Sequence, residues 1–386
     1  MATFKISWRW KTILGVAICA PIGLWACRHF SEPTWEKTCP QLREKKNWKE
    51  MARVAERWSK ASPDRADPWL FRAEAAHQLK DSPAEVSYLN RVPDSDRRIV
   101  ATLLRKGRLE DETLNRPWDA LRTCDRIRTI DPHSLGAHQY PIYFFAKTLQ
   151  RGELLRRLRA AIELRVESPE FYMFLAGASW LIPNGVYQTN ARWLEADPGN
   201  EILLVARAMH VYRLEVKKRP ERAAEFAHVP EPEDLLETFP RNLELLDYFL
   251  DLKITDGDLE GIEAVLAAVP QAAAENDPRF LRGRAWILNA RGKIDEAEQL
   301  LRRGFAIDPY WQVIHYDMSQ ILRRTGKIEE LERFLKIHSA SRALSMNIIE
   351  VQNPNDSKFL QGMLELAILV EDQDVVNSLQ HRLSVR

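Results

Sequence analysis

The side chains in this 386-residue sequence that could bind a metal or act in catalysis include nine histidines and four cysteines. Zinc proteases use the pattern His-Glu-x-x-His, serine hydrolases use Gly-x-Ser-x-Gly, and P-loop enzymes use a glycine-rich loop that ends in Gly-Lys-Ser or Gly-Lys-Thr. None of these patterns occurs in the sequence. His133 and His138 are close neighbours, but no acid or cysteine is spaced to complete a site with them, so we expect capping or surface roles. The sequence therefore predicts no catalytic residue, no metal and no cofactor.

One acidic segment, Asp-Gly-Asp-Leu-Glu-Gly at residues 256–261, is similar to the start of a calcium-binding loop. Such a loop needs a glutamate at its twelfth position, where both carboxylate oxygens bind the ion. That position is Ala267 here. We therefore interpret the segment as a turn between two helices.

The four cysteines, Cys19, Cys27, Cys39 and Cys124, include no Cys-x-x-Cys pair of the kind that binds zinc. Cys39 and Cys124 could form a disulfide in an oxidising compartment. The alternative is two separate thiols, because the two residues are far apart in the sequence. Cys19 lies in an apolar run and is expected to behave as a small hydrophobic residue.

The composition favours a folded helical protein without a strong charge. Hydrophobic residues make up 45% of the chain and charged residues 29%, and long stretches are rich in Ala, Leu, Glu and Arg, which favour helices. The 56 basic and 55 acidic residues leave a net charge of +1. Proteins that bind nucleic acid usually carry a basic excess, so we expect no nucleic-acid partner.

The N-terminal sequence has the pattern of an export signal or a signal anchor. Lys5, Arg9 and Lys11 precede residues 12–27, a run of sixteen residues without a charged side chain. A helix of that length spans about 24 Å, slightly less than the hydrocarbon core of a bilayer, and flanking tryptophans would extend the span into the headgroups. We expect residues 1–30 to be a single-pass membrane anchor. Because basic residues before the run stay inside, the rest of the chain should lie on the non-cytoplasmic side, in the periplasm or outside the cell if the source is bacterial.

Other interpretations of the same residues compete with the anchor. Leu24-Trp25-Ala26-Cys27 resembles a bacterial lipobox, which would make Cys27 a site of lipidation, although Trp25 departs from the small or branched residue usual at that position. A cleaved signal peptide, a mitochondrial presequence and a simple buried helix are the further alternatives.

Internal self-similarity is the clearest pattern in the chain. Residues 290–296 (ARGKIDE) and 324–330 (RTGKIEE) match at an offset of 34 residues, which places Gly292 and Gly326 at equivalent positions. Glycine suits a tight turn between two helices because it adopts positive φ angles without strain. Further turns of this kind are expected at Gly107, Gly152 and Gly257.

The unit over residues 278–309 resembles the tetratricopeptide repeat, with aliphatic residues in place of the family's aromatics. Ala285 and Ala297 take the small positions where the two helices of a unit cross most closely, and Arg284 departs from the usual leucine. The resemblance is most specific over residues 241–340. It implies an all-α fold, a right-handed α-solenoid of antiparallel helix pairs that follows the N-terminal hydrophobic helix.

We expect residues 31–216 to form an N-terminal block of helix pairs and residues 241–386 a C-terminal block. Residues 217–240 are rich in proline and charge and should be an irregular connection, and residues 341–356 a second irregular stretch. The expected helices are 41–61, 68–80, 83–91, 95–106, 114–130, 134–150, 153–166, 169–181, 186–196, 200–217, 233–238, 241–255, 258–269, 278–291, 293–307, 310–325, 327–340, 356–370 and 372–384.

The resemblance also implies a concave surface lined by the first helix of each pair, which would bind an extended peptide. Its arginines would contact a carboxylate and its aromatic side chains would bury area at low entropic cost. The clamp that chaperone-binding members of the family use is not implied, because Arg282 and Trp286 occupy the places of its lysine and asparagine. The groove residues of the two clear units are Arg279, Arg282, Trp286, Asn289, Val313, Tyr316, Gln320 and Arg323.

These patterns favour a protein that catalyses nothing and binds other proteins or peptides as a membrane-tethered scaffold or adaptor. The alternative is a structural subunit of a membrane complex without an exchangeable ligand. We expect no small-molecule substrate. An enzyme or an enzyme regulator would need a cleft in which acids and histidines converge.

Overall fold

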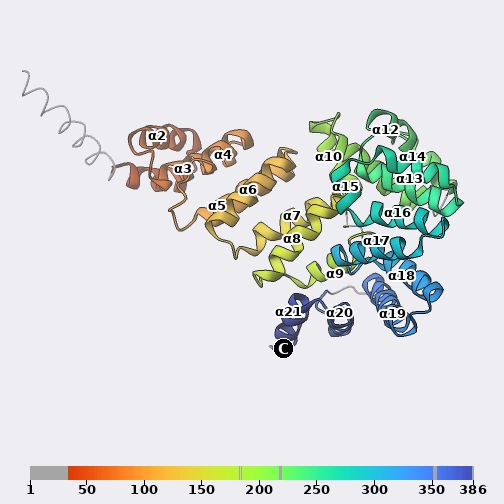
Figure 1. Ribbon diagram of the computed structural model, residues 1–386. Helices are drawn as coiled ribbons and strands as arrows, with labels where there is room; N and C mark the ends of the chain where they lie inside the picture. The colour runs from red at the N-terminus through yellow and green to blue at the C-terminus, as the bar shows by residue number, and fades with distance from the viewer. Residues whose placement is uncertain (1–33, 182, 184, 217–219, 351–353, 385–386) are drawn as a thin grey trace, which may run out of the picture. The chain divides into compact units, whose positions relative to one another are not determined.

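The computed structural model describes residues 34–181, 183, 185–216, 220–350 and 354–384 (Figure 1). Every regular element in these ranges is helical, and consecutive helices form antiparallel pairs, which confirms the predicted all-α fold of tetratricopeptide-like hairpins. The predicted hydrophobic helix of residues 1–30, with Cys27, lies outside the described residues. Within the described ranges, no helix is long and apolar enough to cross a bilayer.

The chain divides into two compact units, residues 1–131 and 132–386, and each is described by itself. The division falls after Asp131, whereas the sequence suggested a connection at 217–240. The described part of that segment lies inside the second unit and contains the 3-10 helix η3 (Pro220–Phe226) and the short helix α12 (Pro232–Thr238).

The first unit is a series of helices that pack on their neighbours in the sequence. Its second helix repeats apolar residues at intervals of four and three, Met51, Ala55 and Trp58, and this stripe is buried against Cys39 and Ala75. The described elements are a helix over 34–44, α2 (Trp48–Ala61), α3 (Ala66–Gln78), α4 (Ser82–Leu89), α5 (Ile99–Arg108), the π-helical turn η1 (Leu109–Thr113) and α6 (Pro117–Ile130).

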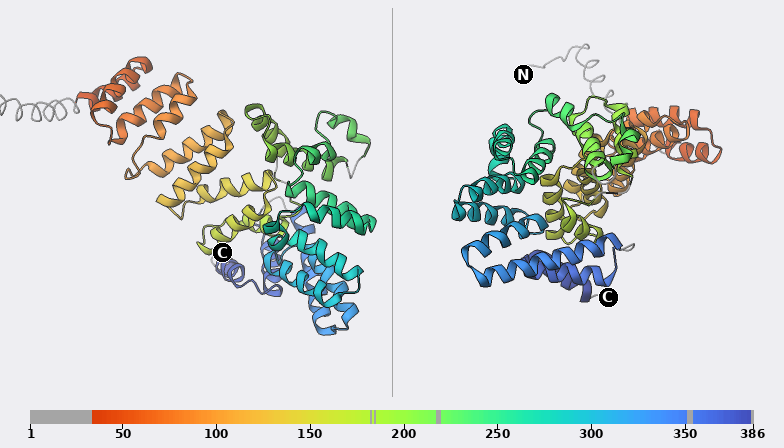
Figure 2. Two further views of the ribbon diagram at one scale, coloured as in Figure 1. Left: turned by 45° about the horizontal axis from the view of Figure 1, so that its top comes forward. Right: turned by 90° about the vertical axis from the view of Figure 1, so that its right-hand side faces the viewer.

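The second unit continues the hairpins, and each helix from α16 to α21 packs on the next one (Figure 2). Its last helices also return to its first ones, because α21 contacts α8 while α19 and α20 contact α9. Besides η3 and α12, the unit comprises α7 (Leu135–Lys147), α8 (Arg151–Glu163), α9 (Pro169–Gly177), α10 (Val186–Ala196), α11 (Glu201–His210), the π-helical turn η2 (Val211–Val216), α13 (Leu243–Asp256), α14 (Leu259–Ala268), α15 (Gln271–Asn276), α16 (Pro278–Ala290), α17 (Ile294–Ile307), α18 (Gln312–Thr325), α19 (Ile328–Glu350), α20 (Ser357–Leu369) and α21 (Gln373–Ser384).

Left-handed residues make the turns inside the hairpins. Gly257, Gly292 and Gly326 have φ angles of 71°, 77° and 71°, as predicted. The expectation for Gly107 and Gly152 is wrong, because both lie within helices, α5 and α8. In these two regions the left-handed position is filled by non-glycine residues, Asn115 (φ 54°) and Leu149 (φ 57°), which the glycine pattern could not reveal.

One predicted boundary is wrong, and one short helix was not predicted. Helix α19 runs to Glu350, so the predicted irregular stretch at 341–356 is helical over its first ten residues. These residues contain no glycine or proline, so nothing in them ends a helix. The short helix α15 was not predicted and fills the link between α14 and α16.

A repeated histidine contact anchors two of the hairpins. In both Asp131-Pro132 and Asp308-Pro309, a histidine six residues after the proline approaches the proline's carbonyl oxygen with its Nε2 atom. The His138 Nε2 to Pro132 oxygen distance is 2.8 Å, and the His315 Nε2 to Pro309 oxygen distance is 2.8 Å. A carbonyl only accepts, so each Nε2 carries the proton and donates. His138 is therefore a buried structural residue, and the surface role considered for it is wrong.

The structure also describes Cys39, Cys124 and the calcium-like segment. Cys39 and Cys124 are buried and are not joined in a disulfide, and burial raises the pKa of the Cys39 thiol to about 11. The calcium-like segment is a helix–helix turn, in which Gly257 is left-handed and Asp258 caps α14 through the N–H of Gly261. Among the described residues, no group of histidines, cysteines and acids has the arrangement of a metal site.

Candidate functional site

The predicted groove residue Arg282 is held by two acids rather than left open for a ligand. Its Nε donates to the Asp317 Oδ2 at 2.6 Å, and its Nη1 donates to the Asp251 Oδ1 at 2.9 Å. These acids lie on the neighbouring helices α18 and α13, so the guanidinium links three successive first helices. The sequence could not show this, because the partners are 35 and 31 residues away.

Arg279 is also buried, and it belongs to a cluster of three arginines and three acids inside the second unit. It is 6% exposed, and its Nη2 lies 2.7 Å from Asp277 Oδ2, while Nη1 pairs with Glu244. A peptide could reach this side chain only by displacing those acids. Arg279 is therefore a structural ion-pair residue in the free protein.

The other groove residues lie nearer the surface. On α18, Val313 is 38% exposed and Tyr316 is 52% exposed, and Arg323 is exposed beside the half-buried Gln320. Their spacing of three, four and three residues places them on one face of the helix. On α16, Trp286 is half-buried against the core around Phe280, and Asn289 accepts a hydrogen bond from Arg324.

The buried cluster distributes its hydrogen bonds unevenly among three arginines. Arg213 donates to Asp247 (Nη2 to Oδ2, 2.8 Å), and Arg279 donates to Glu244 and Asp277. Arg151 approaches Asp247 and Glu244 at longer range. Its Nη1 lies 3.5 Å from Asp247 Oδ2, and its Nη2 lies 3.8 Å from Glu244 Oε2. Its side chain makes no hydrogen bond to the described residues, and its buried Nε has no partner there.

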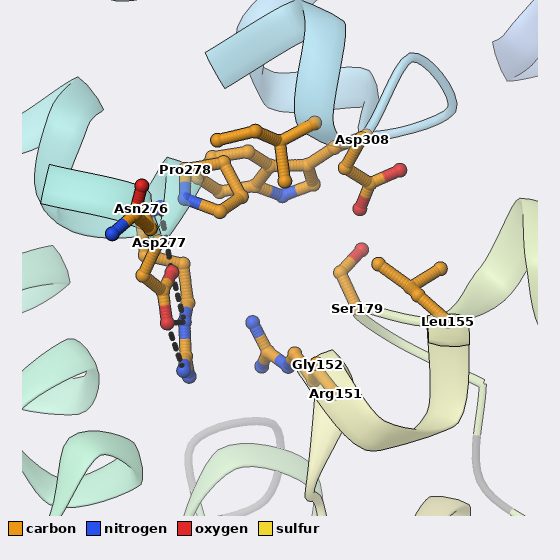
Figure 3. A pocket seen from close by; sticks show the side chains of 11 residues that line it. Arg151, Gly152, Leu155, Ser179, Asn276, Asp277, Pro278 and Asp308 are labelled. Carbon is orange, nitrogen blue, oxygen red and sulfur yellow. Dashed lines mark hydrogen bonds and ion pairs between the residues drawn. The ribbon is translucent and has the colours of Figure 1, made fainter. Parts of the chain in front are cut away.

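A cavity of about 110 Å³ opens beside Arg151 (Figure 3). The N-terminal end of α8 forms one wall with Arg151, Gly152 and Leu155, and the ends of α15, α16 and α17 form the others. Ser179 and the carboxylate of Asp308 point into the same space. A second, larger cavity of about 370 Å³ shares Arg151, Gly152, Asp277 and Arg279.

Asp308 is a buried acid whose carboxylate has few polar contacts. It is 8% exposed, and within the described chain its carboxylate accepts one hydrogen bond, from the backbone N–H of Tyr310 at 3.2 Å. Burial raises the pKa of this carboxyl to about 6, against which the charges of Arg159 and Arg151 act. An isolated carboxylate at this depth destabilises the fold unless a partner reaches it.

We expect Asp308→Asn to stabilise the protein at pH 7.5 by about 2 kcal/mol. A folded-state pKa near 6 against 3.8 for the free group means that ionisation disfavours folding, by at most about 3 kcal/mol. The stability that the protonated acid retains below about pH 4 is lost as the pH rises through 6, and Asn avoids that loss while still accepting the N–H of Tyr310. Denaturant unfolding of both proteins at pH 4.5 and 7.5 measures the difference. An equal gain at both pH values would contradict the assignment.

Two further acids join the start and the end of the second unit. Asp372, at the N-terminus of α21, pairs with Arg159 of α8 and accepts a hydrogen bond from the Tyr310 hydroxyl at 2.8 Å. Glu167 accepts from the Ser378 hydroxyl at 2.6 Å and from the Tyr172 hydroxyl at 3.0 Å. The contacts of Asp372 with Arg159 and of Ser378 with Glu167 hold the α21 region against α8 and the segment before α9 (Figure 1).

The comparisons with known proteins come from solved structures, because no family model and no curated protein matches the chain. The chain is similar to a tetratricopeptide repeat protein from Parabacteroides merdae, with 12% identity, 67% of this chain and 98% of that chain covered, and a TM-score of 0.30. For yeast Tom70 the identity is 12%, the coverage 88% and 96%, and the TM-score 0.27. For the C-terminal part of a repeat protein from Cytophaga hutchinsonii the identity is 13%, the coverage 71% and 95%, and the TM-score 0.28. Scores this low carry no conclusion about function, and the fold assignment rests on the helix pairs of this chain.

Proposed function

We propose that the chain is a protein-interaction scaffold without catalytic activity, and that its binding surface is the exposed face of α18. The observation that supports this surface most directly is the exposure of Tyr316 and Val313 on a helix whose other apolar side chains are buried. Exposed tyrosine is a common anchor in protein interfaces, since it buries a large area and loses little side-chain entropy.

The charge beside this surface indicates the chemistry of the partner. Arg282 has its charge balanced by Asp251 and Asp317, so it has little to offer an acidic ligand. Arg323 is exposed on the same face as Tyr316, and its Nη1 has one long contact, 3.4 Å to Gln320 Oε1. A peptide that places an apolar side chain on Tyr316 and an acidic side chain on Arg323 would match both groups.

The variants that best test this surface alter exposed residues rather than Arg282. Arg282→Glu would place a third acid between Asp251 and Asp317, so it would disturb folding as well as binding. Tyr316→Ala and Arg323→Glu alter exposed groups instead. We expect each to reduce recovery of wild-type partners in affinity capture at least fivefold, with unchanged helicity by circular dichroism. The matched control is Ala306→Glu on α17, which is exposed and should leave recovery unchanged. Equal recovery with all four proteins would exclude the α18 surface.

A permanent subunit of a larger complex is the second candidate, and exposed apolar side chains on α19 and α20 favour it. On α19 and α20, Met346 is 53% exposed, Ile349 70% and Ile368 53%. Such side chains are typical of an interface that stays covered. In that case the partner would be recovered in fixed stoichiometry and would resist high salt, and Ile349→Asp would release it while Tyr316→Ala would not.

We also propose that residues 12–27 tether the scaffold to a membrane, with the repeat units on the non-cytoplasmic side. The support is the uncharged run preceded by basic residues in the sequence. Removing residues 1–30 should move the protein from the membrane fraction to the soluble fraction with its helicity retained. Replacing Cys27 by serine in the full chain separates a lipid anchor, which would be lost, from a helical anchor, which would persist. A truncated chain that still sediments with membranes would exclude this tether.

A further inference from the structure

Arg151 and Asp308 carry opposite charges into one cavity without satisfying each other. Arg151 has donors that make no hydrogen bond to the described residues, and its ion-pair distances to Glu244 and Asp247 are 3.8 and 3.5 Å. Across the cavity, Asp308 has one backbone donor, and no ion pair joins it to Arg151 among the described residues. Figure 3 shows both side chains, and the hydroxyl of Ser179, directed into the space between them.

From this arrangement we propose that the cavity beside Arg151 binds a free α-amino acid, whose carboxylate contacts Arg151 and whose ammonium group contacts Asp308. An arginine binds a carboxylate through two parallel N–H donors, and an ionised aspartate accepts from an ammonium group. The ligand would therefore supply hydrogen-bond acceptors to Arg151, whose ion pairs with Glu244 and Asp247 are long, and a charged donor to Asp308, which has one backbone donor. The sequence predicted no ligand of this kind.

The balance of charges favours a ligand with both groups over a simple anion or cation. The nearby acids Glu244, Asp247 and Asp277 already balance Arg151, Arg213 and Arg279, so an added anion alone would face an uncompensated Asp308. A cation alone would leave the donors of Arg151 unused. A zwitterionic ligand gives a carboxylate to Arg151 and an ammonium group to Asp308, and it leaves the net charge of the buried site unchanged.

The rest of the cavity suits a small apolar side chain. The apolar part of the lining comprises Leu155, Pro278, Ile307 and Trp311, and Ile307 is 43% exposed, so the space reaches the surface. Asn276, Asp277 and Arg279 are the other polar residues that line it. A cavity of about 110 Å³ limits the ligand to a compact molecule. Gly152, in the first turn of α8, also lines the cavity, and a helix N-terminus favours a carboxylate.

Isothermal titration of the full-length protein with L-alanine, L-valine and L-leucine tests this proposal. We expect saturable one-to-one binding of at least one of them with a Kd below 1 mM. The blocked derivatives N-acetyl-alanine and alanine amide, and the fragments acetate and methylammonium, should bind at least tenfold more weakly. Binding of acetate as tight as that of the amino acid, or no saturable binding of the three amino acids at 20 mM, would overturn the proposal.

Single variants identify the two contacts. Arg151→Gln and Asp308→Asn should each weaken binding at least tenfold, whereas Arg156→Gln on the same helix and Asp295→Asn on α17 should not change it. Unfolding could not explain a loss of binding in the Asp308→Asn variant, because this variant is expected to be more stable than the wild type. Undiminished binding in either cavity variant would overturn the assignment.

The pH dependence separates an ammonium contact from an acid–carboxylate contact. The charged groups that face Asp308 are Arg151 and Arg159 from α8 and Asp277 from the start of α16, and its pKa is raised to about 6 by burial. Because the ammonium needs the ionised acid, binding should weaken at least fivefold between pH 7.5 and 5, and the Asp308→Asn variant should lose this dependence. Tighter binding at pH 5 would mean that the protonated acid shares its proton with a carboxylate, which contradicts the proposed orientation.

Discussion

Asp247→Asn is expected to destabilise the second unit by about 3–5 kcal/mol, because it removes one of the acids that balance the buried Arg279 and the half-buried Arg151 and Arg213. Asp247 is 4% exposed and lies 2.8 Å from Arg213, 3.6 Å from Arg279 and 3.5 Å from Arg151, each measured from its Oδ2 to a guanidinium nitrogen. Burial alone would raise the pKa of Asp247, but the arginines outweigh burial and hold that pKa well below its ordinary value. The asparagine would leave one arginine charge buried without an anion.

Hydrogen exchange of peptides from α13 and α16 measures this loss within the full chain, and peptides from α6 in the first unit serve as an internal reference. Asp256→Asn, an exposed acid at the end of the same helix, is the matched control and should change stability by less than about 0.5 kcal/mol. The double variant Asp247→Asn with Arg151→Gln should recover part of the loss, since it removes the arginine that makes the fewest contacts. A change below 1 kcal/mol for Asp247→Asn would show that the cluster is not a buried charge network.

Asp372→Ala is expected to loosen the C-terminal helices by about 3 kcal/mol. The carboxylate pairs with Arg159, accepts from the Tyr310 hydroxyl and caps α21 through the N–H of Val375 at 3.3 Å. Loss of a helix cap costs about 1 kcal/mol, and a buried hydroxyl without an acceptor costs about 1–3 kcal/mol more. Tyr310 is 1% exposed, so water cannot replace the lost acceptor easily.

The same exchange measurement distinguishes a local effect from a global one. Peptides from α20 and α21 should lose protection, whereas those from α13 and α16 should keep theirs. The matched control is Asp374→Ala. Asp374 is exposed and lies two residues after Asp372, so this variant removes an acid without removing these contacts. If both variants had the same small effect, the contact between the two ends of the second unit would not contribute to its stability.

Local signals made the helical hairpins predictable from the sequence. Gly292 and Gly326 mark turns at the repeat spacing, and the Asp-Pro pair at 308 and 309 stands between two helices. The breaks between helices near residues 150 and 371 were also predicted, but the left-handed residues that make them, Leu149 and Glu371 (φ 57° and 62°), were not.

The candidate site was predictable only where it depends on one helix. The spacing of Val313, Tyr316 and Arg323 sufficed to place them on one face of α18. The ion pairs that hold Arg282 and Arg279 were not predictable, because their acidic partners come from other helices. The cavity between Arg151 and Asp308 joins α8 to the end of α17, and neither residue has a neighbour in the sequence that indicates the other.

Asp308 connects the stability of the second unit with its proposed ligand. If Asp308→Asn raises the free energy of unfolding and also weakens ligand binding, the carboxylate lowers the stability of the fold but is needed for the ligand. The exposed face of α18 is a separate site, since its residues do not touch this cavity. Loss of amino-acid binding and loss of partner binding can therefore be tested independently.

The scaffold function is tested most directly by a photoreactive amino acid placed at Tyr316 in the full-length protein in its native cells. A second protein carries the same group at Ala306 on α17. We expect irradiation to join the Tyr316 protein to a discrete partner, while the Ala306 protein gives no such product. Discrete products from Ala306 and none from Tyr316 would contradict the account.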